Sequence, residues 1–159
     1  MSAGWLLAFL FDAICAAICS YALVRGGKPE RFGAAVNLLA VGATWALRVQ
    51  DTSHLAPADS LVFLIDLAVA GSFFWLGVTT IRFWPIWAAG FALADLFMSV
   101  CGALLPHIPL FAYHTGLGVY AYLALGALVL GTWRLPQSAE PYLRNGSRRS
   151  WLQHLKEMS

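Results

Sequence analysis

The chain has 159 residues, of which 60% are hydrophobic and only 11% are charged. Soluble domains usually contain about 45–50% apolar and about 25% charged residues. The composition therefore excludes an ordinary soluble domain and predicts an integral membrane protein with a single domain. The lipid bilayer is the first expected partner, and no nucleic-acid partner is expected.

Five apolar segments reach or approach the length of about 20 residues that a membrane-spanning helix needs. The first segment is interrupted by Asp12 and lacks the positively charged start of a signal peptide, so we expect a retained helix. Between the third and fourth segments, Arg82 breaks the apolar run and Pro85 suits the first turn of a new helix, which predicts an antiparallel hairpin. The predicted spans are Trp5–Val24, Phe32–Leu47, Leu61–Ile81, Phe83–Leu105 and Leu110–Trp133.

The connections between these segments are rich in residues that favour turns. Arg25–Arg31 contains two glycines and a proline, so we expect a loop there. Val49–Ser60 forms a longer second loop, and Pro106–Pro109 turns the chain into the fifth span. The predicted fold is thus all-α, a polytopic transmembrane helical bundle with five spans.

The distribution of positive charge predicts how this bundle is oriented. Arg48 falls on one side of the five predicted spans, and the other nine lysines and arginines fall on the opposite side. Positive residues that flank short loops stay in the cytoplasm, so we expect the N-terminus outside and the C-terminus inside. The nine residues are Arg25, Lys28, Arg31, Arg82, Arg134, Arg144, Arg148, Arg149 and Lys156.

Residues 1–134 are therefore predicted to form the five-helix transmembrane domain, and residues 135–159 a polar cytoplasmic tail. Within the tail, residues 148–158 place apolar side chains on one helical stripe with basic side chains elsewhere, which predicts a short amphipathic helix. Such a helix suits an anionic membrane surface; docking to another protein and disorder are the alternatives. The residues expected to contact the membrane surface or a partner are Arg148, Arg149, Trp151, Leu152, Leu155 and Lys156.

Three aspartates, Asp12, Asp66 and Asp95, lie inside predicted spans. An ionisable group at membrane depth costs at least a few kcal/mol, so it usually faces a protein interior or a polar path. At about 1.5 Å of helix rise per residue, the three lie roughly 10, 8 and 15 Å below the outer face. We therefore predict an acidic layer in the outer leaflet, with Arg48 above it at the end of the second helix.

Two main interpretations of this layer remain open. Each aspartate can pair with Arg48, a tyrosine, a serine or a backbone group, and so hold helices together. Alternatively, carboxylates this deep repel one another and lose hydration, which favours protonated forms and provides a proton or cation site. Contact with a ligand or another subunit is a third possibility.

The histidines permit a metal hypothesis, because imidazole and carboxylate groups suit zinc or copper. Surface histidines without a ligand role are the alternative. The sequence contains no GxSxG, HExxH or nucleotide-binding loop, so we expect no enzyme activity. The candidate metal ligands at the outer face are His54, His107 and His114.

Two aromatic stretches carry a resemblance. Arg82–Phe91 (RFWPIWAAGF) and Gly131–Arg134 (GTWR) resemble segments of small polytopic inner-membrane proteins of alphaproteobacteria. The resemblance implies a bacterial inner membrane and nothing about activity or cofactors.

The leading functional hypothesis is an accessory, scaffold or assembly subunit of a larger inner-membrane complex, since the chain is small and rich in aromatic residues. Its partners would be other membrane subunits or further copies of itself. The alternatives are a small oligomeric carrier or channel that couples protons or cations through the aspartates, and a binder of a metal or a lipophilic ligand.

Overall fold

The computed structural model describes residues 3–50, 57–104, 110–136 and 138–158; no side chain is described at 3–8, 48–50, 57–60, 102–103 and 110–118. The described residues are almost entirely helical and form no strand, apart from an isolated bridge between Thr80 and Ser147. The prediction of an all-α fold is confirmed. The helices are α1 (Ala3–Arg25), α2 (Lys28–Gln50), α3 (Pro57–Thr79), α4 (Trp84–Leu104), α5 (Leu110–Trp133), α6 (Pro141–Asn145) and α7 (Arg148–Met158).

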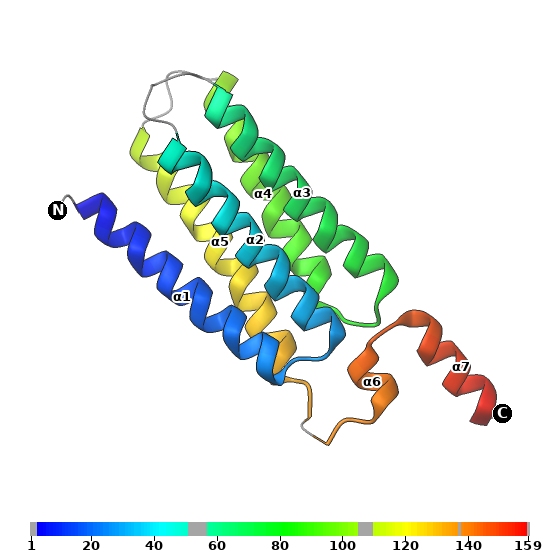
Figure 1. Ribbon diagram of the computed structural model, residues 1–159. Coiled ribbons are helices and arrows are strands. Elements are labelled where there is room, and N and C mark those ends of the chain that lie inside the picture. The colour runs from blue at the N-terminus through cyan, green and yellow to red at the C-terminus, as the bar shows by residue number, and fades with distance from the viewer. Residues whose placement is uncertain (1–2, 51–56, 105–109, 137, 159) are drawn as a thin grey trace.

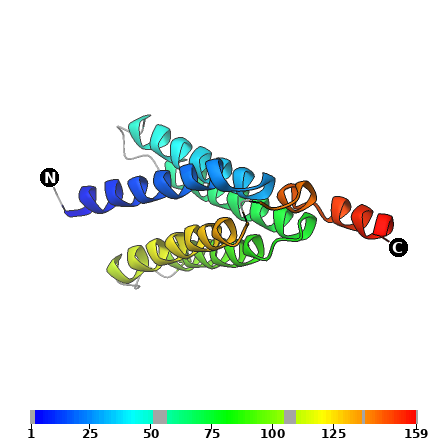
Figure 2. The ribbon, with the colours of Figure 1, turned by 90° about the horizontal axis from the view of Figure 1, so that it is seen from below.

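The five long helices lie side by side, and the chain reverses direction between successive helices (Figure 1). α3 packs along α4 and α4 along α5, α1 packs on α2, and both α1 and α2 also contact α5 and so close the bundle. The short α1–α2 and α3–α4 connections lie at the end of the bundle opposite the N-terminus (Figure 1). α6 lies against that end, and α7 extends away from it (Figure 2).

Proline marks the start of several helices, because its fixed φ angle and missing N–H suit the first turn. α2 begins at Lys28, so the chain between α1 and α2 consists only of Gly26 and Gly27. The predicted loop over 25–31 was therefore wrong; Pro29 starts a helix rather than following one. α5 has the predicted bounds. The prolines in the first two positions of α2, α3, α4 and α6 are Pro29, Pro57, Pro85 and Pro141.

Among the described residues, the largest fully buried side chain is that of Trp84, at the first residue of α4. Its indole is fully buried and meets Phe73 of α3 edge-on, with ring centroids 6.0 Å apart. The ring lies between Gly33 of α2 and Gly131 of α5, and a Cβ added at either glycine would collide with it. Small residues let membrane helices approach closely, and here two glycines make room for the largest side chain of the core.

Replacing Gly131 with alanine is expected to lower the free energy of unfolding by about 1–3 kcal/mol, because the added methyl group overpacks a rigid site. Gly126→Ala on the same helix is the matched control. A Cβ at Gly126 meets no neighbouring atom, so this change should be neutral or stabilise the helix by up to about 1 kcal/mol. Thermal unfolding in mild detergent measures both; equal melting temperatures would contradict the packing described.

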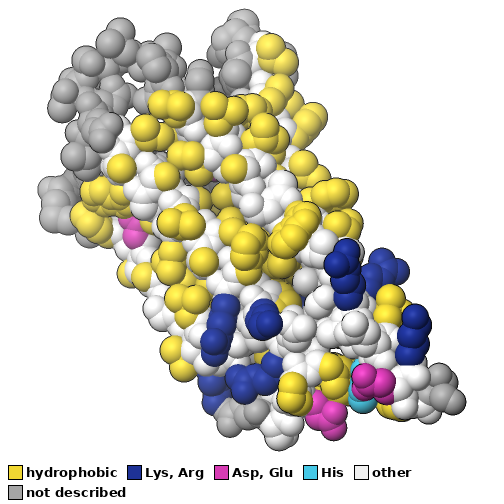
Figure 3. Space-filling view, turned by 45° about the vertical axis from the view of Figure 1, so that its right-hand side comes forward, with side chains coloured by type: hydrophobic (Ala, Val, Ile, Leu, Met, Phe, Trp, Pro, Cys, Tyr) yellow, Lys and Arg dark blue, Asp and Glu magenta, His cyan; other side chains and the backbone are white. Residues whose placement is uncertain are grey.

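Within the part of the chain that the structure describes, two helical stretches are apolar and long enough to cross a membrane: Leu61–Thr79, with mean hydropathy 2.1, and Trp84–Cys101, with mean hydropathy 1.4. Val119–Trp133 is a shorter apolar helix. Only 17% and 28% of the two longer stretches are buried, whereas the core helix of a soluble protein is mostly buried. On the face shown in Figure 3, hydrophobic side chains are spread along the body of the molecule. These two helices indicate association with a membrane.

Candidate functional site

Asp12, the first of the predicted site residues, belongs to the contact between α1 and α2. The indole Nε1 of Trp45 donates a hydrogen bond of 2.8 Å to Asp12 Oδ2. The ring of Phe9 packs against Trp45, with centroids 6.1 Å apart. The carboxylate is thus joined to a neighbouring helix, and its partner is a tryptophan, a residue type absent from the partners that the sequence analysis considered.

Asp66 and Asp95 belong to α3 and α4, two helices that pack along each other. One carboxylate oxygen of Asp95, Oδ1, is buried and has no hydrogen-bond partner among the described atoms. Of the three predicted aspartates, Asp12 is therefore the one with a side-chain partner described here, and the acidic layer stays a prediction.

The other residues predicted for the outer face are Arg48 and three histidines, and none of their side chains is among those described. Arg48 lies in the last turns of α2, at the end opposite α6, and His114 lies in α5, but both side chains are outside the described set. His54 and His107 lie outside the described residues altogether. No group of three or more potential metal ligands occurs within the described part of the chain, which contains none of these three imidazoles. The metal hypothesis stays a prediction.

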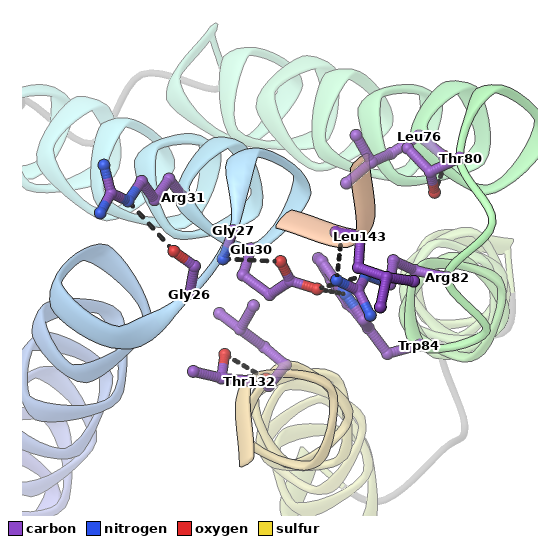
Figure 4. Close-up of polar contacts among 11 residues, drawn as sticks. Gly26, Gly27, Glu30, Arg31, Leu76, Thr80, Arg82, Trp84, Thr132 and Leu143 are labelled. Carbon is purple, nitrogen blue, oxygen red and sulfur yellow. Dashed lines mark hydrogen bonds and ion pairs between the residues drawn. The ribbon is translucent and has the colours of Figure 1, made fainter. Parts of the chain in front are cut away.

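A buried carboxylate that the sequence analysis did not select, Glu30, lies at the centre of the opposite end of the bundle (Figure 4). Its Oε2 accepts a 3.0 Å hydrogen bond from the backbone N–H of Gly27, as a glutamate in the third position of a helix commonly does. Its Oε1 accepts a 3.0 Å bond from Trp84 Nε1 and lies 3.3 Å from Arg82 Nε. Glu30 is 0% exposed and the Arg82 side chain 16% exposed, so this is a largely buried ion pair.

Arg82 extends this network to the C-terminal segment. Its Nη2 donates a 2.7 Å hydrogen bond to the carbonyl oxygen of Leu143 in α6 (Figure 4). The backbone N–H of Ile81 donates to the carbonyl of Gly146, which ends α6 with φ of 62°, a conformation that favours glycine. A Cβ at Gly146 would also meet the ring of Pro29. The start of α2, the α3–α4 turn and α6 are therefore fixed to one another.

A helix-start signal in the sequence points to Glu30. A glutamate three residues after Gly27, with Pro29 between them, matches the pattern of a helix N-terminus. The loop predicted over residues 25–31 conceals the helical register of these residues. The partner residues follow no local signal, because Trp84 is 54 residues away from Glu30 along the chain.

The tail residues predicted to contact a surface divide into two sets. A helix is present at Arg148–Met158, as predicted. Trp151 faces α6, where its ring lies 5.6 Å from that of Tyr142, and Leu152 and Leu155 remain 52% and 43% exposed. Arg148 and Arg149 are exposed, as is Lys156.

Basic side chains gather at the end of the bundle that carries α6 and α7, below the hydrophobic body (Figure 3). The chain contains ten lysines and arginines, and Arg48 alone lies near the other end. Both Glu30 carboxylate oxygens have partners, so this residue joins the α1–α2 connection to Trp84 and Arg82. Comparisons with models of protein families, with curated proteins and with solved structures found no match.

Proposed function

We propose that the chain is an inner-membrane protein with five spans, its N-terminus outside and its C-terminus in the cytoplasm. The odd number of long helices and the concentration of nine of the ten lysines and arginines at one end support this orientation. The apolar sides of α3 and α4 would then face lipid or the helices of another protein.

Within that membrane, we propose a non-catalytic role as an accessory or scaffold subunit of a larger complex. The observation that carries this proposal is a pair of exposed apolar stripes with alternating three- and four-residue spacing, one on α3 and one on α4. Each stripe contains a glycine, Gly71 at the middle of the α3 stripe and Gly90 near the start of the α4 stripe, where a Cβ would meet no atom of this chain. The other members are Leu64, Leu67, Phe74 and Val78 on α3, and Ile86, Leu93, Phe97, Val100 and Leu104 on α4.

Such stripes suit close packing by a partner helix, because a glycine lets the two backbones approach. The Glu30–Arg82–Trp84 network supports the same role, since it fixes one end of the bundle and presents a rigid surface. A partner that packs on a rigid surface loses little conformational entropy on the side of the scaffold.

Native mass spectrometry of the full chain, extracted in mild detergent from its own membranes, tests this role. A heteromeric mass of fixed ratio is expected, and Gly90→Leu or Gly71→Leu should release the partner while leaving this chain folded. Gly42→Leu on α2, where a Cβ also meets no neighbour, is the matched control and should retain the partner. A monomer or a homo-oligomer, or loss of the partner in all three variants, would contradict the proposal.

One observation favours a second function, a small carrier coupled to protons or cations. The buried Asp95 Oδ1 on α4 lacks a hydrogen-bond partner among the described atoms, and a second carboxylate, Asp66, belongs to the neighbouring α3. If this pair binds a proton or cation, Asp95→Asn should abolish uptake of the coupling ion in proteoliposomes while melting temperature changes little. Asp12→Asn is the control, because Asp12 is joined to Trp45. Asp95→Asn protein that is folded and fully active, or no uptake by the wild type, would exclude this function.

A further inference from the structure

An open pocket of about 760 Å³ lies at the basic end of the bundle. Its volume falls within the range of about 300–1,000 Å³ that is typical of small-molecule sites. One wall is the α1–α2 connection and the first turn of α2, and the other is α6. The lining residues used below are Gly27, Lys28, Arg31, Tyr142, Arg144 and Asn145.

The charge of the lining is strongly positive. Lys28, Arg31 and Arg144 line the pocket together with no acidic residue. Glu30 lies directly behind Gly27, but it is fully buried and is neutralised by its ion pair with Arg82. Within the described part of the chain, none of these three lining cations forms an ion pair with a carboxylate.

The two walls are held in fixed positions before any ligand arrives. The backbone of Gly27 approaches the carbonyl oxygen of Arg144 so closely that a Cβ at Gly27 would collide with it. Arg31 Nε donates a 3.2 Å hydrogen bond to the carbonyl of Gly26, which orients the guanidinium. The ring of Tyr142 is stacked on His154 of α7, with centroids 4.0 Å apart. A site built in this way does not spend binding energy on ordering its own walls.

From this arrangement we infer that the pocket between the α1–α2 connection and α6 binds a phosphate-bearing anion through Lys28, Arg31 and Arg144. Arginine matches the geometry of phosphate oxygens with paired N–H groups, and lysine adds a point charge. The Tyr142 hydroxyl and the Asn145 amide supply further donors. Because basic pockets beside membrane helices bind lipid headgroups, an anionic phospholipid is one source of the phosphate, and free phosphate is the other.

Native mass spectrometry of the delipidated full chain in neutral detergent tests this site, with phosphatidylglycerol or phosphatidylcholine added. A rise in melting temperature on adding inorganic phosphate is measured in parallel. Phosphatidylglycerol is expected to bind at least about tenfold more tightly than phosphatidylcholine if the source is lipid. Both lipids carry a phosphate, but phosphatidylcholine adds a cation that the three lining cations repel. A phosphate-dependent rise in melting temperature without this lipid preference would assign free phosphate as the ligand.

The variant Lys28→Gln/Arg144→Gln should weaken binding of the preferred anion about tenfold. Arg134→Gln removes a positive charge at the same end of the bundle but outside the pocket, and this variant should bind as the wild type does. Lys28→Glu alone, at an exposed position, gives a second test should the double variant be unstable. Equal losses in the pocket variant and in Arg134→Gln, or neither lipid preference nor a response to phosphate, would overturn the inference.

Discussion

Replacing Trp84 with alanine is expected to lower the free energy of unfolding by about 4–5 kcal/mol, near the top of the range for buried aromatic residues. The indole is fully buried between Gly33 and Gly131, so its loss leaves a cavity that two glycines cannot fill. The change also removes the Nε1 donor from Glu30, a buried carboxylate. Chemical or thermal unfolding of the purified chain in detergent measures the effect.

Trp87→Ala provides the control for the same residue type on the same helix. Trp87 is 61% exposed, so its removal should change the free energy of unfolding by about 1 kcal/mol or less. A further test uses the contact between Trp84 and Gly131. In the Trp84→Ala background, Gly131→Ala should cost little, because the space that the methyl group enters is then empty. Similar effects of Trp84→Ala and Trp87→Ala would show that Trp84 is not the centre of the core.

Replacing Arg82 with methionine is expected to cost about 3–5 kcal/mol, because it leaves the fully buried Glu30 carboxylate without its counter-ion. The same change removes the hydrogen bond to the Leu143 carbonyl, so α6 should become more accessible to proteases. Melting temperature reports the first effect, and the rate of cleavage within residues 138–146 reports the second.

Arg134→Met is the matched control at the same end of the bundle. Arg134 is exposed and its guanidinium carbon lies 5.1 Å above the ring of Phe83, a contact that contributes about 1 kcal/mol or less. The double variant Arg82→Met/Glu30→Gln should be more stable than Arg82→Met alone, since it removes the unpaired charge. An Arg82→Met protein as stable as the Arg134→Met protein would refute the account of the buried ion pair.

Much of the helical architecture follows from the sequence, because long apolar runs and prolines mark where helices lie. α5 has the predicted bounds, and α7 forms where the amphipathic pattern predicts it. The start of α2 was missed because Gly26, Gly27 and Pro29 together match the pattern of a helix end as well as that of a helix start. Only the capping contact of Glu30 with the Gly27 N–H distinguishes the two.

The side-chain network was beyond sequence analysis for a different reason. Periodicity assigns residues to helix faces, but it does not say which faces meet. Arg82 reaches a carbonyl 61 residues away, and Asp12 meets a tryptophan 33 residues away. The aspartates were predicted as site residues because a charged residue is unusual inside an apolar run. Glu30 lies between Lys28 and Arg31, so its charge does not stand out in the sequence. Trp84 and α6 both lie against the start of α2, which explains why Glu30 is buried.

The proposed orientation with five spans is the central claim, because the accessory role and the cytoplasmic position of the basic end both depend on it. Single cysteines introduced as Ser2→Cys or Ser159→Cys can be labelled with a membrane-impermeant maleimide in intact cells. The unsubstituted chain is the blank, since Cys15 and Cys19 are buried and Cys101 is partly buried. Labelling of position 2 in intact cells, and of position 159 only after permeabilisation, is the predicted result. Labelling of both positions from the same side would contradict an odd number of spans.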